Sequence, residues 1–208
     1  MTQTGLSLSP QAAAAQGPSR LQLLGYRQAL LAIAAGVACA AISQLFGRTL
    51  HWVWPIPTFG SIAAAFPRAV VLLVLVSRTR RLGVLTTAAA AEIGAKFALG
   101  VGVMWPVAIF APIMGNLAGD ALWAVLRDNS RRSAVLALVG AGLCGARILA
   151  ALVFWSLLRP ALADAPHNIG LLLAVILATN VTLGMLAGCV VGQSGKLRKR
   201  GSDNVQDE

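Results

Sequence analysis

Long, nearly uncharged apolar runs dominate this chain and restrict what it can fold into. Of its 208 residues, 57% are hydrophobic and 12% are charged. A helix of roughly 20 mostly apolar residues crosses a bilayer. The runs predict about six such helices, at residues 28–46, 60–77, 82–104, 105–126, 133–158 and 169–192. The expected fold is all-α, a polytopic integral membrane protein built as a bundle of about six transmembrane helices.

The net charge of +10 is unevenly placed along the chain. Basic residues gather in alternate connections and at the ends, as Arg20 and Arg27, then Arg78, Arg80 and Arg81, then Arg127, Arg131 and Arg132, then Lys196 to Arg200. Cytoplasmic loops of membrane proteins carry this excess of Lys and Arg. The pattern therefore predicts cytoplasmic N and C termini, and it indicates topology rather than nucleic-acid binding.

Three segments are expected along the chain. We expect a disordered leader at residues 1–19 and a six-helix transmembrane domain at residues 20–195. We expect a basic then acidic cytoplasmic tail at residues 196–208. The three cysteines lie inside apolar runs at unrelated spacings, which favours packing over a disulfide framework or a metal site.

Sequence motifs of catalysis are missing from the chain. It contains no HExxH, GxSxG, CxxC or P-loop pattern, and its two histidines fall in predicted outer loops. We therefore expect no catalytic residues, no metal and no cofactor, and we expect that the chain does not hydrolyse ATP itself.

Several polar residues interrupt the predicted spans, where ionisable groups usually face a partner or a cavity. They are Arg68, Glu92, Lys96, Asn116, Asp120, Arg147 and Asn180. Glu92 and Lys96 have the i,i+4 spacing of an intrahelical ion pair, and Arg147 has Glu92 or Asp120 as its expected counter-ion. Along the sequence, the ionisable residues are expected at different depths.

Asn116 and Asp120 lie one turn apart in the run "GNLAGD". Asn116 lies farther from the basic inner end, so we expect it to contact a solute that enters from outside. Asp120 has two alternatives: a solute contact, or a structural bond to Arg127, Arg131 or another helix.

Tryptophans and prolines gather at the predicted outer ends. Trp54 and Trp105 fit either an interfacial aromatic belt or a site that stacks a flat ring. In the first span, Ala32, Gly36 and Ala40 share one small-residue face. That face fits either packing inside the bundle or docking of a partner subunit.

The layout resembles the substrate-binding S components of energy-coupling factor (ECF) transporters, and most of all their hydroxymethylpyrimidine/thiamine group. Three stretches carry the resemblance: "ALLAIAAGVACAA", "FGSIAAAFPRAVVLLVLVSRTRRLGVLTTAAAAEIGAKFALG" and "WPVAIFAPIMGNLAGDALWAVL". Together they cover about residues 28–126. Lys96 beside Glu92 departs from a purely acidic site for a cationic ligand.

The resemblance implies a binding subunit of an ABC-type importer in the bacterial inner membrane. It would bind a small water-soluble vitamin or precursor near the outer face and deliver it with a transmembrane coupling subunit and cytosolic ATPases. The implied partner face is Ala32, Gly36 and Ala40, and the expected substrate contacts are Trp54, Glu92, Trp105, Asn116, Arg147 and Asn180. Two alternatives stay open: a structural or assembly subunit of a membrane complex, and an enzyme of lipid or isoprenoid metabolism.

Overall fold

The computed structural model describes residues 25–53, 57–100, 105–127, 132–158 and 168–204. Helices account for nearly all of these ranges, and no strand occurs in them. The helices are α1 (Tyr26–Val53), α2 (Pro57–Thr79), α3 (Val84–Ala98), α4 (Trp105–Leu126), α5 (Arg132–Leu158) and α6 (Asn168–Asn204). The all-α prediction is confirmed, and α4 has the predicted bounds. The predicted leader, residues 1–19, lies outside the described residues.

Five of these helices are long and apolar enough to cross a membrane, through the stretches Tyr26–Gly47, Ile62–Thr79, Pro106–Leu126, Ser133–Phe154 and Leu171–Ser194. Large apolar side chains such as Leu31, Val125 and Leu171 are exposed on the outside of the bundle. Exposure on this scale suits lipid rather than water. By length, composition and surface, the chain is a multi-pass membrane protein.

The third predicted span, residues 82–104, is a shorter helix than expected. Helix α3 has 15 residues, which at 1.5 Å per residue gives roughly 22 Å against a hydrocarbon core of roughly 30 Å. Gly83 precedes it with φ 78° and Gly100 follows it with φ 71°. These left-handed conformations suit glycine and end a helix. The apolar run therefore predicted a helix in the right place but of the wrong length.

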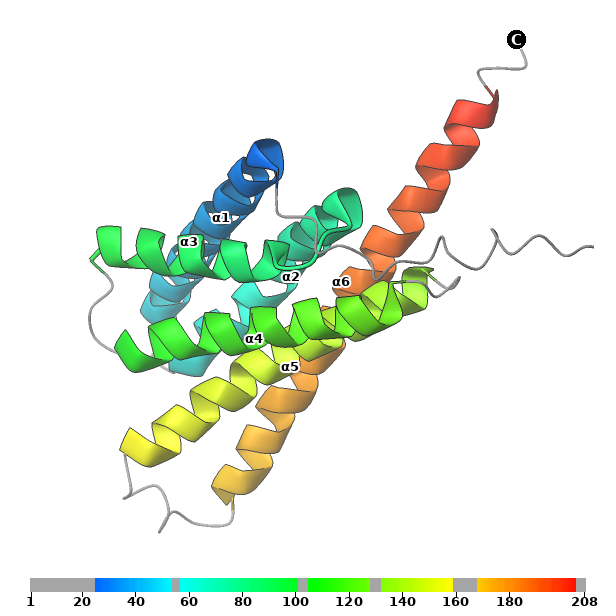
Figure 1. Ribbon diagram of the computed structural model, residues 1–208. Coiled ribbons are helices and arrows are strands. Elements are labelled where there is room, and N and C mark those ends of the chain that lie inside the picture. Colours follow the sequence, from blue (N-terminus) through cyan, green and yellow to red (C-terminus); the bar gives the residue numbers. More distant parts are fainter. Residues whose placement is uncertain (1–24, 54–56, 101–104, 128–131, 159–167, 205–208) are drawn as a thin grey trace, which may run out of the picture.

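Helix α6 extends beyond the boundary predicted at residue 195. Its 37 residues continue to Asn204 and include the basic run Lys196 to Arg200. Figure 1 shows this C-terminal part of α6 projecting beyond the rest of the bundle. The change from apolar to charged composition thus marks no end of the helix.

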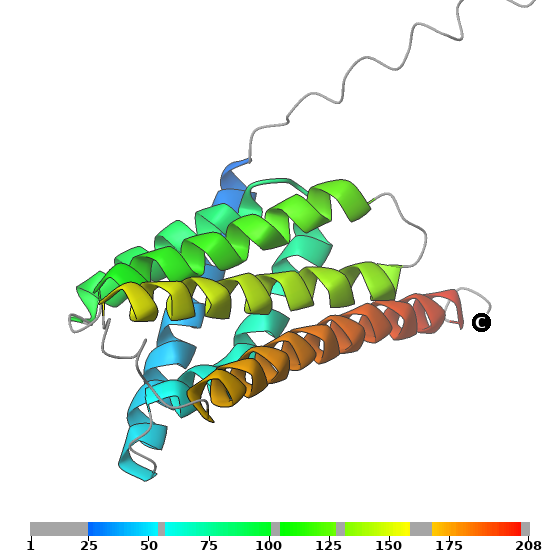
Figure 2. The same ribbon diagram turned by 90° about the horizontal axis from the view of Figure 1, so that it is seen from below.

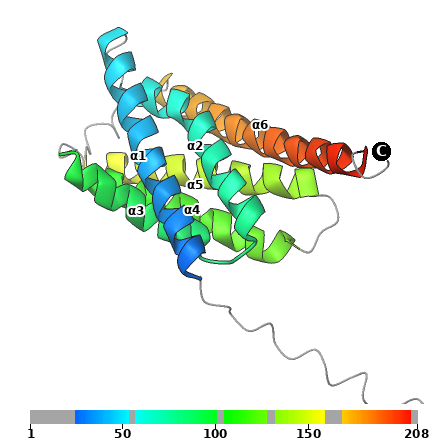
Figure 3. The same ribbon diagram turned by 90° about the horizontal axis from the view of Figure 1, so that it is seen from above.

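Helix α2 lies at the centre of the packing, against α1, α3, α5 and α6. Its residues Leu72, Leu73 and Val76 are fully buried. Helices α4, α5 and α6 lie side by side in that order (Figure 2). Helices α1 and α2 cross over α3 and α5 (Figure 3). The core therefore forms where two obliquely crossing layers of helices meet.

Four of the helices form a closed ring. Helix α2 packs on α3, α3 on α4, α4 on α5, and α5 again on α2, whereas the described parts of the opposite helices, α2 and α4 or α3 and α5, bring no Cα atoms within 8 Å of each other. Side chains from all four helices can therefore meet along the axis of the ring.

Glycines allow the closest helix contacts. A methyl group on Gly140 of α5 would collide with the carbonyl oxygen of Gly184 on α6, and one on Gly188 would collide with that of Leu136. Gly184 and Gly188 have the four-residue spacing by which small residues bring membrane helices together. This column fixes α6 against α5.

Candidate functional site: a buried charge cluster

Glu92 lies at the centre of a buried cluster of charged side chains. Its side chain is 1% exposed, and Lys96 of the same helix approaches it with 2.7 Å between Nζ and Oε1. Arg68 on α2 is at 3.7 Å from the same oxygen. Arg147 on α5 donates to both carboxylate oxygens, with 3.1 Å between Nη1 and Oε2. One carboxylate thus joins three helices.

The predicted Glu92–Lys96 ion pair is confirmed, and Arg147 takes Glu92 rather than Asp120 as counter-ion. Both guanidinium nitrogens of Arg147 engage the carboxylate, which is the geometry of a strong bidentate pair. Because no Cα of α3 lies within 8 Å of one in the described part of α5, this pair spans the ring that the four helices form.

The expectation that the ionisable residues lie at different depths is wrong for four of the five. Arg68, Glu92, Lys96 and Arg147 converge although they are up to 79 residues apart, from 68 to 147. Sequence reasoning gave Arg68 no part in the site. It follows Pro67 inside α2, and its contact with Glu92 depends on how α2 and α3 cross.

Positive charge is in excess at this cluster. Three cations, Arg68, Lys96 and Arg147, surround one anion, Glu92, so the formal charge is 3 − 1 = +2. All four side chains are nearly buried, at 12% exposed or less. A neutral Lys96 would still leave one cation in excess. Buried charges are ordinarily paired, so this imbalance is unusual.

Asn116 on α4 is fully buried, and neither its amide nitrogen nor its amide oxygen has a hydrogen-bond partner. Its neighbours on α4 show where it points. A methyl group on Gly115 would lie 2.8 Å from Cβ of Arg147 on α5, whereas Asp120 bonds to α3. At 100° per residue, Asn116 points about 40° from Asp120 and about 100° from Gly115. It is therefore directed into the ring between α3 and α5, at the level of Arg147.

Asp120 of α4 has a structural role, because it caps the start of α3. Its carboxylate accepts the backbone N–H of Thr86 at 2.9 Å and that of Leu85 at 3.4 Å. It also accepts the Thr86 hydroxyl at 2.7 Å. The first N–H groups of a helix have no partner within the helix, and Gly83 at the N-cap has no side chain to supply one. Of the alternatives for Asp120, a bond to another helix is the one observed.

Among the remaining predicted contact residues, only Asn180 has a side chain that the structure describes. Asn180 on α6 is buried, and its amide nitrogen donates to the Ile176 carbonyl of its own helix at 2.9 Å. Trp54 lies outside the described residues. Trp105 begins α4, and its side chain is outside what the structure describes. The aromatic predictions therefore stay predictions.

The small-residue face of α1 is occupied inside the chain. Ala32 and Ala40 are fully buried. A methyl group on Gly36 would collide with the Ala88 carbonyl oxygen and lie 2.9 Å from the Glu92 nitrogen. Packing within the bundle thus describes this face, and the alternative of a free docking face for a partner is not available to it. The close contact also supports α3 at the position of Glu92.

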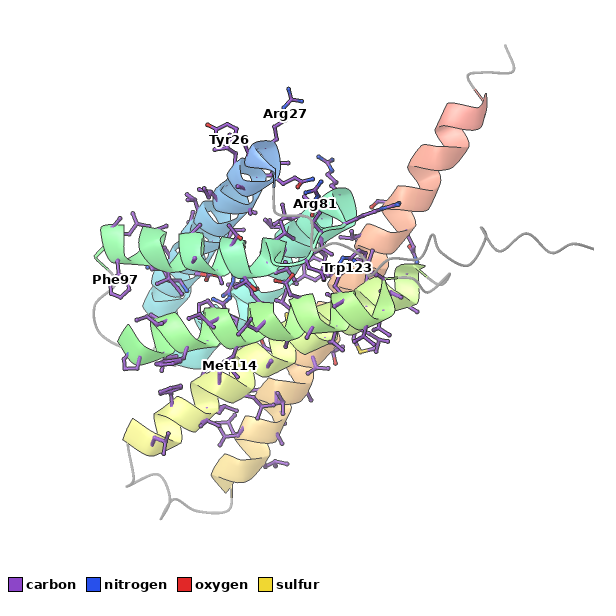
Figure 4. The ribbon with its side chains drawn as sticks, in the orientation of Figure 1. Tyr26, Arg27, Arg81, Phe97, Met114 and Trp123 are labelled. Atoms are coloured by element: carbon purple, nitrogen blue, oxygen red, sulfur yellow. The ribbon has the colours of Figure 1, made fainter. Side chains whose placement is uncertain are left out.

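Within the described ranges, no group of three or more His, Cys, Asp and Glu residues could hold a metal ion. Figure 4 shows the side chains on the helices, with Arg81 just before α3, Phe97 toward its far end and Trp123 near the end of α4.

Comparison with family models, with curated proteins and with solved structures finds no match to this chain.

Proposed function

We propose that this chain is a membrane-embedded substrate-binding subunit of an ECF-type importer. It binds a small water-soluble vitamin or precursor inside the helix bundle and carries out no chemistry on it. A coupling membrane protein and cytosolic ATPases supply the energy for uptake, and the site of action is the bacterial inner membrane with both chain termini cytoplasmic.

One observation carries this proposal: a polar site closed off inside an apolar bundle. Arg68, Glu92 and Arg147 come from α2, α3 and α5 and are joined in one cluster, and the buried, unpartnered amide of Asn116 on α4 is directed into the same ring. Polar groups buried in a membrane protein are costly, and they commonly mark the path of a solute. The unpartnered amide of Asn116 is the group with the most to gain from a bound molecule.

The coupling subunit would have to contact a face other than Ala32, Gly36 and Ala40. Helix α1 exposes Leu31, Ile33 and Val37 on its outer side, and this apolar face is open to lipid or to a neighbouring protein. Co-purification of the tagged chain with its coupling subunit and ATPases would test the partners directly.

A binding assay tests the central claim. The protein in nanodiscs would be titrated with a panel of water-soluble vitamins while the tryptophan fluorescence is recorded. Submicromolar binding of one of them, reduced in Asn116→Leu and unchanged in Asn180→Leu, is the expected result. The complete lack of a saturable response would contradict the proposal.

The second candidate is a structural or assembly subunit of a membrane complex. The ion pairs that Glu92 forms with residues of α2 and α5 favour it. In that case the cluster only holds helices together. Loss of a larger complex after mutation, in a protein that binds no solute, would support this role over transport.

A further inference from the structure

The charge cluster leaves hydrogen-bond donors unused. Glu92 already receives both nitrogens of the Arg147 fork and the Lys96 ammonium. Arg68 approaches it at 3.7 Å, which is too long for a hydrogen bond. The Nε of Arg68 is buried without any partner. Arg68 is thus a buried cation whose donors are poorly used.

Asn116 adds a second set of unused groups from the opposite side of the ring. Its amide is fully buried without a partner and points between α3 and α5. Helices α2 and α4, which carry Arg68 and Asn116, bring no Cα atoms within 8 Å of each other in their described parts. Unused donors therefore border the axis of the ring from two opposing walls.

The charge balance selects the kind of molecule that would use these donors. With three cations against one carboxylate, a neutral guest leaves the excess charge and a cationic guest increases it. An anion reduces the excess and accepts hydrogen bonds from guanidinium and amide groups, the pairing in which Arg is strongest. The same reasoning disfavours thiamine, which is a cation.

We propose that the ring between α2, α3, α4 and α5 binds an anionic group, a carboxylate or a phosphate, with Arg68 and Asn116 as donors. This inference rests on the proposed function and specifies its substrate class. Glu92 then has a positioning role: it holds the fork of Arg147 and the ammonium of Lys96 in place without contacting the ligand. The anionic group belongs either to a free solute or to a lipid headgroup.

Matched pairs of probes test the charge requirement. The protein, in nanodiscs of phosphatidylcholine, would be titrated by calorimetry with nicotinate against nicotinamide and with pantothenate against pantothenol. Inorganic phosphate and thiamine would serve as the smallest phosphate and as a cation. We expect an anion to bind and its neutral counterpart to bind about 10- to 100-fold more weakly, since a hydrogen bond to a charged group is lost. A parallel arm with phosphatidylglycerol in the nanodisc detects a lipid headgroup as the source.

Two variants separate a binding site from a merely structural cluster. Arg68→Met removes one excess cation, so the unfolding temperature of the empty protein should rise while anion binding weakens about 10- to 100-fold. Arg78→Met, at the exposed end of the same helix, should change neither quantity. Glu92→Gln should keep or tighten anion binding, whereas it would abolish binding of a cationic ligand.

The outcomes are distinguishable. If a neutral or cationic solute binds more tightly than the anionic probes, and this binding is lost in Glu92→Gln, the result would support transport and overturn the anion site. Stabilisation by phosphatidylglycerol alone, lost in Arg68→Met, would support the anion site and contradict solute transport. No response to any free anion or to phosphatidylglycerol, or an Arg68→Met protein that is less stable and binds anions unchanged, would overturn the inference.

Discussion

Arg147 on α5 holds both carboxylate oxygens of Glu92 on α3, although the described parts of these helices bring no Cα atoms within 8 Å of each other. The pair therefore reaches across the interior of the ring rather than along a helix interface. Arg68 and Lys96 approach the same carboxylate. Replacing Glu92 or Arg147 therefore changes the charge balance of all four side chains.

The first prediction concerns this pair. Glu92→Gln leaves three cations close together in a buried site, and we expect it to lower the free energy of unfolding by about 3 kcal/mol. Thermal unfolding of the protein in nanodiscs measures the change. The double variant Glu92→Gln/Arg147→Gln should recover part of the loss, since it has one fewer unpaired cation. Strictly additive effects would contradict a direct interaction between the two residues.

The second prediction concerns Asn116. Its amide is buried without a partner, so in the ligand-free protein Asn116→Leu should raise the free energy of unfolding by about 1 kcal/mol. The same variant should weaken ligand binding, because it removes a donor and an acceptor from the site. Stability and affinity thus change in opposite directions, which calorimetry and thermal unfolding on one sample can show.

Asn180 is the matched control for Asn116, since it is also buried but bonds to Ile176 of its own helix. Asn180→Leu should leave ligand affinity unchanged. Equal losses of affinity in both variants would mean that the effect comes from the packing of the bundle and not from contact with a ligand.

The positions of the helices are the part of the fold that the sequence predicted well. Runs of about 20 apolar residues located all six helices, and the i,i+4 spacing predicted the ion pair of Glu92 and Lys96. Both signals are local. The length of α3 was missed because Gly83 and Gly100, which end it, lie within a run whose hydropathy continues past them.

Which residues make up the site depends on how the helices cross. Neighbouring residues in the sequence do not indicate this crossing. Nothing near Arg68 in the chain indicates that it approaches Glu92, 24 positions away in sequence, 92 − 68. For Ala32, Gly36 and Ala40 the small side chains indicated a close helix contact but not its partner. The structure assigns that contact to α3.

The third prediction tests the role of Asp120 as a cap for α3. Asp120→Asn should lower the free energy of unfolding by about 1 kcal/mol, because acceptors of the first N–H groups are weakened. Combined with Thr86→Val, which removes the hydroxyl bonded to Asp120, the losses should be less than additive. Thr87→Val is the control, because the Thr87 hydroxyl donates to the carbonyl of Gly83, the residue just before α3, and not to Asp120; its effect should add to that of Asp120→Asn. A structural role would be contradicted if Asp120→Asn lowered the free energy of ligand binding by more than it lowered the free energy of unfolding.

The last prediction concerns the contact between α1 and α3. In Gly36→Ala, the new methyl group would meet the Ala88 carbonyl oxygen and the Glu92 nitrogen, so α1 must move away from α3 and the free energy of unfolding should fall by about 1–3 kcal/mol. Gly47→Ala is the control on the same helix, because a methyl group there meets nothing within 4 Å, and the higher helix propensity of alanine should add about 0.5–1 kcal/mol. Because Glu92 is at the contact, Gly36→Ala should also weaken ligand binding. If this face instead served a partner subunit, Gly36→Ala would reduce co-purification of that subunit while the isolated chain stayed as stable as the wild type.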